Sequence, residues 1–267
     1  MSALPLMTCG LRTLAALLFV AAVGGVPAAT QPVAPPATIA AAANLNFALT
    51  EVAERFKRET GTSVTLVFGA SGTLTRQIQD GAPFEMFLAA DEEFPAQLAA
   101  AGLTRGAATV YAVGQLVIFS PTGSPLIADA SLAGLARLAR AGGVSRFAIA
   151  NPAVAPYGRA AEAVLRKRGL WVTLQPALVL GDSITQAAQF ATTGNAVGGL
   201  LAYSLVLAPG FADRGTYAVI PAADHPPLRQ AMVLLPAAGP VATAFYAYMR
   251  RDAARSILRK HGFSVPE

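Results

Sequence analysis

Four positions in the sequence join the end of an apolar segment to the expected beginning of a helix. They are Asn44, Ser71, Tyr157 and Ile184. The first turn of a helix has backbone N–H groups without an internal partner and carries the positive end of the helix dipole, so it can bind an anion without a charged side chain. Four such turns that face one cleft would hold a small dianion by neutral hydrogen-bond donors.

The strength of such a site can be assessed from its hydrogen bonds. Charge-assisted bonds contribute about 1.5–3 kcal/mol each, and micromolar to nanomolar affinity needs roughly 8–12 kcal/mol. About five to seven donors would therefore be enough. No Arg or Lys lies within 43–46, 69–73 or 153–157, so the ligand would be held by neutral groups that also permit its release.

Each residue also has an ordinary structural interpretation. Asn44 and Ser71 are residue types that favour helix N-caps, Tyr157 could be a packed aromatic side chain, and Ile184 alone indicates nothing. Asp182, two positions before Ile184, could cap a helix or accept the proton of an ion such as hydrogen phosphate. The combination of the four positions, and no single one of them, indicates the anion site.

Catalytic and metal-binding patterns are weak. Ser71 stands in Gly-Ala-Ser-Gly-Thr at 69–73, which differs from the Gly-x-Ser-x-Gly elbow of hydrolases. His225 and His261 are far from Ser71 in sequence and are predicted to be surface residues. No cluster of His, Asp or Glu with ligand spacing appears. We expect no enzyme, no cofactor and no bare metal ion, and a serine hydrolase that uses Ser71 remains a less favoured alternative.

The N-terminal segment differs in kind from the rest. Arg12 precedes an uncharged apolar run over 14–26, which is shorter than the about 20 residues of a spanning helix. We predict a signal peptide over 1–28, a flexible exit segment over 29–37, and a periplasmic location. Loss of Cys9 with the signal peptide leaves no thiol, which suits an oxidising compartment.

Charge and periodicity bound the class of the remaining chain. The formal charge falls from +5 to +4 without Arg12, and the basic residues are scattered, so no nucleic-acid partner is expected. Apolar runs and helical patterns alternate, which predicts an α/β protein with mainly parallel sheets. The expected strands are 38–43, 64–68, 84–89, 110–119, 147–150, 177–180, 196–202 and 231–235. Helices are expected from 45 to a stop at Gly61, after 72 as far as 81, over 91–102, 158–168 and 183–193, and in the closing segment 241–261.

Several segments together resemble one protein family. They are 40–45 (AAAANL), 68–74 (FGASGTL), 78–91 (IQDGAPFEMFLAAD), 151–158 (NPAVAPYG) and 181–184 (GDSI). These segments are similar to those of the periplasmic molybdate-binding proteins of ABC importers, a branch of the type II periplasmic binding-protein superfamily. The similarity extends over essentially the whole sequence after the predicted signal peptide.

The resemblance implies a fold of two lobes, each a mainly parallel sheet flanked by helices, joined by two crossover strands near Gly114 and Val219. Lobe 1 would comprise 38–113 and 220–267, and lobe 2 would comprise 114–219. The ligand would be molybdate or tungstate, and the partner would be an ABC importer permease in the inner membrane. The protein would act as a monomer that delivers the ion to this permease. Sulfate, phosphate or ferric ion remain alternative ligands.

The resemblance also implies a role for each site residue. Asn44 and Ser71 would donate from side chain and backbone, and Tyr157 and Ile184 mainly from backbone N–H groups. Many relatives have a binding tyrosine at the place that matches Ala202 here. Tyr203 follows one residue later, and the role is not transferred to it.

Overall fold

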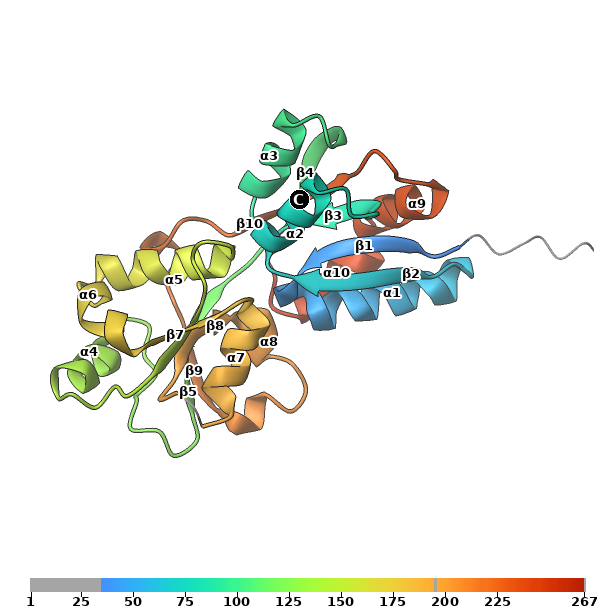
Figure 1. Cartoon of the computed structure of the whole chain (residues 1–267). Coiled ribbons are helices and arrows are strands. Elements are labelled where there is room, and N and C mark those ends of the chain that lie inside the picture. The colour runs from blue at the N-terminus through green and yellow to red at the C-terminus, as the bar shows by residue number, and fades with distance from the viewer. Residues whose placement is uncertain (1–34, 195, 267) are drawn as a thin grey trace, which may run out of the picture. The chain divides into compact units, whose positions relative to one another are not determined.

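The computed structural model describes residues 35–194 and 196–266 and contains two five-stranded sheets (Figure 1). The predicted signal peptide lies outside the described residues, as do residues 29–34 of the predicted exit segment. Ala37, the last residue of that predicted segment, already begins the first strand. The two sheets, each flanked by helices, confirm the predicted two-lobe α/β fold.

The first sheet has the strand order β2-β1-β3-β10-β4. β1 pairs in parallel with β2 and β3, whereas β10 is antiparallel to both β3 and β4. Its strands are β1 (Ala37–Ala42), β2 (Val64–Gly69), β3 (Met86–Leu88), β4 (Arg105–Val113) and β10 (Arg229–Leu234). Its helices are η1 (Ala43–Leu45), α1 (Asn46–Thr60), α2 (Ser71–Gln79), α3 (Glu93–Ala100), α9 (Pro240–Met249) and α10 (Asp252–Lys260).

The central strands of this sheet are buried on both faces, which explains their continuous apolar sequence. Alternate residues of β1 belong to different cores. Ile39 packs with α1, α9 and α10, where Phe56 contacts Phe245 edge to face at 5.2 Å. Ala40 packs with Leu74 of α2 and the apolar residues of α3. Helices therefore cover both faces of β1, and its carboxyl end leads directly into η1.

The second sheet repeats this arrangement with the order β7-β6-β8-β5-β9. β6 is parallel to β7 and β8, and β5 is antiparallel to β8 and β9. Its strands are β5 (Leu116–Pro121), β6 (Phe147–Ala150), β7 (Leu178–Gly181), β8 (Gly199–Ala202) and β9 (Gly215–Val219). The helical segments are α4 (Ala133–Arg140), α5 (Pro156–Lys167), α6 (Trp171–Leu174), η2 (Gln175–Ala177), α7 (Ile184–Thr192), α8 (Tyr203–Val206), η3 (Ala212–Arg214) and η4 (Ala222–Asp224).

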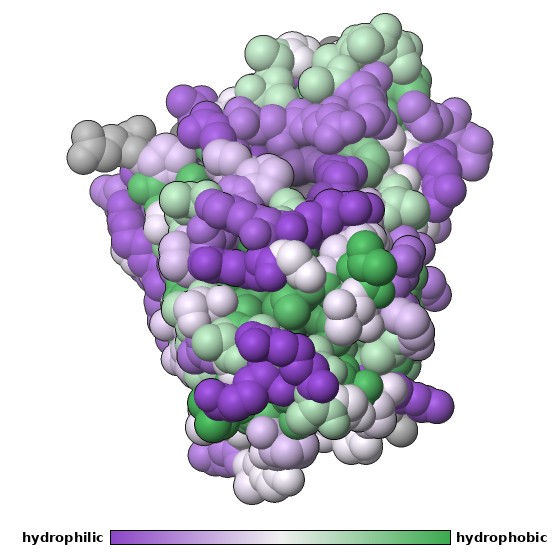
Figure 2. Space-filling model, turned by 90° about the vertical axis from the view of Figure 1, so that its left-hand side faces the viewer, coloured by the Kyte–Doolittle hydropathy of each residue, from purple (hydrophilic) through white to green (hydrophobic). Residues whose placement is uncertain are grey.

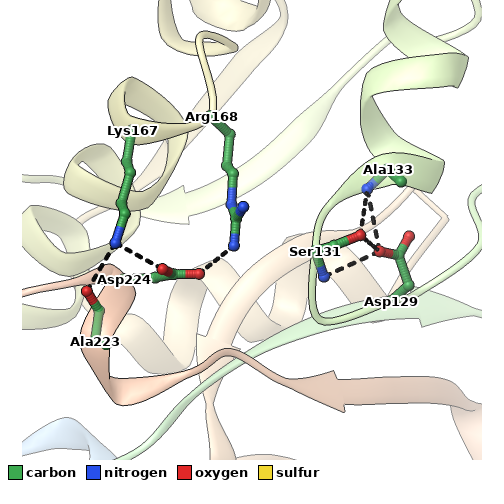
Figure 3. Close-up of polar contacts among 7 residues, drawn as sticks. All are labelled: Asp129, Ser131, Ala133, Lys167, Arg168, Ala223 and Asp224. Carbon is green, nitrogen blue, oxygen red and sulfur yellow. Dashed lines mark hydrogen bonds and ion pairs between the residues drawn. The ribbon is translucent and has the colours of Figure 1, made fainter.

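Two carboxylates fix connections around this sheet (Figure 3). Asp224, in the segment that returns to the first sheet, pairs with Lys167 at 2.7 Å and with Arg168 at the end of α5. Asp129 accepts hydrogen bonds from the backbone N–H groups of Ser131 and Ala133. Asp224 therefore joins the return segment to α5, and Asp129 caps the beginning of α4. The sequence patterns did not predict α4.

The predicted strand over 110–119 is two strands in different sheets. β4 ends at Val113 in the first sheet and β5 begins at Leu116 in the second, with Gly114 between them. A Cβ on Gly114 would lie 2.2 Å from the Tyr157 hydroxyl oxygen, so only glycine fits there. The chain returns through β9 to β10. The exact lobe boundaries stay a prediction.

The described surface carries several exposed hydrophobic residues. Hydrophilic and hydrophobic residues are interspersed over the face drawn in Figure 2. Large apolar side chains that are exposed are Phe47, Ile127, Val172, Leu180, Tyr217 and Val219. Within the described ranges, every helix is too short or too polar to cross a bilayer.

Candidate functional site

One small cavity brings all four predicted residues together. Its volume is about 10 Å³, and its lining includes Asn44, Ser71, Tyr157 and Ile184. Asn44 and Ser71 come from the first sheet's connections, and Tyr157 and Ile184 come from those of the second. The helix beginnings that the sequence places at four distant points therefore converge.

The local structure differs from ordinary N-capping at Asn44 and Ser71. Asn44 lies within η1, and Ser71 is the first residue of α2. The residues in the cap positions of η1, α2 and α5 are Ala42, Ala70 and Ala155, whose side chains cannot cap. The interpretation of Asn44 and Ser71 as N-caps is wrong, and both side chains line the cavity.

Ser71 is held so that its hydroxyl proton is available. Its Oγ accepts a hydrogen bond from the Ala90 backbone N–H at 3.0 Å, and the residue is buried. A hydroxyl has one proton and two acceptor lone pairs, so this contact leaves the proton free to donate. The cavity lining contains no His, Asp, Glu, Lys or Arg. Ser71 therefore has no general base among the residues that surround the cavity.

Asn44 and Tyr157 meet through a residue that sequence reasoning missed. Asn44 Nδ2 donates to Gln230 Oε1 at 3.1 Å, and Gln230 Nε2 donates to the Tyr157 hydroxyl at 3.3 Å. Burial raises the pKa of Tyr157 well above its ordinary value, so this phenol stays neutral. Asn44 Oδ1 is buried without a hydrogen-bond partner. No sequence signal marked Gln230, because it lies in the inner strand β10, far along the chain from every apparent motif.

Ile184 begins α7 and is buried in the cavity wall, so its apolar side chain leaves only the backbone to donate. Ser183 caps this helix by accepting from the Gln186 N–H at 3.3 Å. Asp182 is exposed and does not line the cavity, and its backbone N–H donates to Gln186 Oε1 at 2.6 Å. The capping role considered for Asp182 therefore belongs to Ser183.

Neither residue at the predicted place of the relatives' tyrosine lines the cavity. Ala202 is buried at the end of β8, and Tyr203 begins α8 with its ring 5.7 Å from that of Tyr217. A Cβ on Gly262 would come within 2.7 Å of the Tyr203 ring. The Tyr203 side chain is thus packed against Gly262 and Tyr217.

Hydrogen bonds also join the two lobes around the cavity. The Gly72 N–H donates to the Val154 carbonyl oxygen at 2.9 Å, and Thr185 Oγ1 donates to the Ala43 carbonyl oxygen at 3.2 Å. Ser204 Oγ donates to the Asn44 carbonyl oxygen at 2.8 Å. These contacts hold the helix beginnings of both lobes together, and they already use the first-turn N–H of Gly72.

A cluster of charged and aromatic side chains joins the lobes beside the cavity. Arg159 of α5 pairs with Asp91, lies 3.4 Å from Glu93 Oε2, and has its guanidinium carbon 4.9 Å from the centre of the Phe94 ring. Burial raises the pKa of the Asp91 carboxyl, although the Phe94 N–H and Arg159 oppose this effect. We call Asp91, Glu93, Phe94 and Arg159 the interlobe clasp. Sequence spacing indicated Asp91 only as a helix beginning.

The predicted surface positions of the two histidines are wrong. His225 and His261 are each 9% exposed. His261 Nε2 lies 2.8 Å from Glu51 Oε2, because the end of α10 packs onto α1, and this contact and Lys260 lower the Glu51 pKa. His225 Nδ1 lies 2.8 Å from the Pro226 carbonyl oxygen. Within 35–194 and 196–266, no three His, Cys, Asp or Glu residues gather as metal ligands.

A larger hollow lies elsewhere in the second lobe. Its volume is about 640 Å³, and it is lined by the turn after β5, the end of α7 and the Asp213–Arg214 segment. None of the four predicted residues borders it. Size alone therefore does not identify the candidate site, whereas the convergence of helix beginnings does.

Comparisons with known proteins agree with this fold. Residues 37–264 match the family model described as bacterial extracellular solute-binding protein. The molybdate-binding protein ModA of Azotobacter vinelandii is 38% identical over 230 residues, covering 85% of this chain and 89% of that protein. The ModA of Rhodobacter capsulatus is 39% identical over 227 residues, with coverage of 84% and 86%.

A solved structure supports the same relationship. The periplasmic molybdate-binding protein of Azotobacter vinelandii superposes with a TM-score of 0.79 at 28% identity, covering 86% of this chain and 100% of that chain. The predicted resemblance to periplasmic molybdate-binding proteins is therefore confirmed. With its two sheets, its matched residues 37–264 and these relatives, the chain belongs to the bacterial extracellular solute-binding protein family.

Proposed function

We propose that this protein captures molybdate or tungstate between its two lobes and delivers the ion to the permease of an ABC importer in the inner membrane. The protein works in the periplasm after removal of the signal peptide predicted over 1–28. It acts as a monomer and without a cofactor or a catalytic step. The observation that carries the proposal is the convergence of Asn44, Ser71, Tyr157 and Ile184 on one uncharged cavity.

The chemistry of the lining supports a fully ionised oxyanion. Ser71 has a free hydroxyl proton, and the beginnings of α2, α5 and α7 contribute first-turn N–H groups and helix dipoles. A dianion that leaves water needs such donors in place of its hydration shell. Because the donors are neutral, the ion is bound without a strong charge pair and can be released to the permease.

Relatives support the choice of ligand. The two curated proteins at 38% and 39% identity bear the name molybdate-binding protein. Ferric ion is disfavoured, because it needs several phenolate and carboxylate or histidine ligands, and the lining contains one tyrosine and no carboxylate. Sulfate and hydrogen phosphate remain the competing ligands, and they differ from molybdate in size and protonation.

A panel of ligands tests the proposal. The melting temperature is measured with molybdate, tungstate, sulfate, phosphate and ferric ion in parallel. A ligand at a hundred times its Kd adds about 2.7 kcal/mol to the free energy of unfolding. We expect the largest increase with molybdate or tungstate. An increase confined to phosphate or ferric ion, or none at all, would refute it.

A further inference from the structure

Gln230 lies at the centre of a buried polar network behind the cavity. It is 0% exposed and sits on β10. Its Oε1 receives Asn44 Nδ2 at 3.1 Å and the Tyr111 hydroxyl at 2.9 Å, while its Nε2 faces the Tyr157 hydroxyl at 3.3 Å. One amide therefore connects proposed ligand residues from both lobes.

The protons of this network do not suffice for its acceptors. The Tyr111 hydroxyl oxygen lies 2.9 Å from both the Ala89 carbonyl oxygen and Gln230 Oε1. A hydroxyl has one proton, and a carbonyl can only accept. When the Tyr111 hydroxyl donates its proton to the Ala89 carbonyl oxygen, the oxygens of Tyr111 and Gln230 face each other with no proton between them. Asn44 Oδ1 is a further buried acceptor that lacks a donor.

If oxygen and nitrogen exchange places in the side-chain amides of both Gln230 and Asn44, every acceptor of the network receives a hydrogen bond. Gln230 Nε2 then donates to the Tyr111 oxygen and to Asn44 Oδ1, and Gln230 Oε1 accepts from the Tyr157 hydroxyl. The positions of oxygen and nitrogen in an amide are interchangeable in shape, so the hydrogen bonds decide which orientation is favoured. Asn44 Nδ2 then occupies the place of the unpartnered Oδ1. Its N–H groups are donors that an oxyanion in the cavity can satisfy.

We propose that Gln230 is a positioning residue that sets which atom of the Asn44 amide faces the ligand, and thereby selects the protonation state of the bound oxyanion. The inference rests on the proposed function, because it requires an oxyanion beside Asn44. With Nδ2 toward the cavity, the site favours a fully ionised ion such as molybdate. With Oδ1 toward the cavity, it favours an ion that carries a proton, such as hydrogen phosphate.

A double-mutant cycle tests whether Gln230 acts through Asn44. Molybdate affinity is measured by titration calorimetry for the wild type, Gln230→Met, Asn44→Ala and the double variant. We expect Gln230→Met to weaken molybdate on the order of 10- to 100-fold in the wild-type background, but less than about twofold when Asn44 is already alanine. The preference for molybdate over phosphate should fall in parallel.

Gln115→Met provides the matched control. Gln115 is a partly buried glutamine that does not line the cavity, and its Nε2 donates to the Gly262 carbonyl oxygen at 3.2 Å. Its substitution should leave molybdate affinity unchanged. If Gln230→Met loses its cooperative thermal transition, Gln230→Glu takes its place in the cycle. A carboxylate cannot donate to Asn44 Oδ1, so the same non-additive loss is expected.

A spectroscopic measurement on the wild type reports the amide directly. The Asn44 side-chain signals in a proton–nitrogen correlation spectrum are identified by their absence from Asn44→Ala. Saturation with molybdate should shift them, and phosphate should not shift them in the same way. The positioning role would be overturned if Gln230→Met lost the same molybdate affinity in the wild type and in Asn44→Ala, or if the Asn44 signals did not shift with molybdate. Absence of any oxyanion binding by the wild type would instead overturn the proposed function.

Discussion

The interlobe clasp should contribute directly to ligand affinity. Replacement of Arg159 by Met keeps much of the side-chain stem but removes the positive charge that pairs with Asp91 and lies over Phe94. Asp91 and Phe94 come from one lobe and Arg159 from the other, so these contacts exist only when the lobes are together. We expect Arg159→Met to weaken the closed state and therefore the binding of molybdate.

The size of the effect follows from the exposure of the pair. The side chain of Asp91 is 12% exposed and that of Arg159 is 34% exposed. Exposed ion pairs contribute about 0.2–1 kcal/mol, and removal of one partner from a buried pair costs about 3–5 kcal/mol. A pair of intermediate exposure should lose about 1–2 kcal/mol, which corresponds to a Kd increased about 5- to 30-fold.

The cost should fall on the closed state in particular. The Asp91 carboxylate is poorly solvated when the lobes are together, and this burial raises its pKa. Without Arg159, the Asp91 carboxylate has no cation beside it in the closed state, but it becomes hydrated again when the lobes separate. The loss should appear mainly as faster dissociation of the ligand, measured by stopped-flow displacement beside calorimetric affinity.

Arg166→Met is the matched control for Arg159→Met. Arg166 lies on the same helix, pairs with Glu162 at 2.7 Å, and has its guanidinium carbon 4.9 Å from the centre of the Trp171 ring. All of these contacts lie within one lobe, so affinity should not change. Wild-type affinity in Arg159→Met, or an equal loss in both variants, would refute the clasp.

Three further substitutions test other parts of the structure. Ser71→Ala should weaken molybdate by about 1–3 kcal/mol, and unchanged affinity in calorimetry would remove Ser71 from the site. Because the pKa of Asp91 is raised, the folded protein binds this proton more tightly than the unfolded chain, so the free energy of unfolding falls as pH rises from about 4 through the raised pKa. Asp91→Asn should remove that part of the pH dependence in chemical denaturation, and an identical profile would contradict the assignment. Gly114→Ala places a Cβ 2.2 Å from the Tyr157 hydroxyl oxygen and 2.6 Å from Gln230 Nε2; it should cost about 1–3 kcal/mol of stability, and an unchanged melting temperature would refute this crowding.

The sequence predicted the two-lobe fold and the convergence of its four site positions because both depend on local patterns. Apolar runs such as 147–150 end where a helix must begin, and parallel pairing places such ends at one edge of a sheet. Gly114 was predicted as a crossover, and it does separate strands of different sheets. Ligand roles for Asn44, Ser71, Tyr157 and Ile184 stay a prediction.

The remaining features depend on contacts between residues far apart in the chain. Gln230 is 186 positions from Asn44, and Arg159 is 68 positions from Asp91. Nothing in the local pattern around Gln230 distinguishes it from another polar residue in a strand. The burial of His261 likewise depends on how α10 packs against α1. Such partners follow from the packed tertiary structure and have no signal in sequence periodicity.

Titration calorimetry of the unmodified protein with molybdate, repeated in the presence of sulfate or phosphate, tests the central claim most directly. The account predicts saturable binding of one ion per chain with a micromolar or lower Kd, and weaker binding of both competitors. No heat of binding with molybdate, or tighter binding of phosphate than of molybdate, would contradict it.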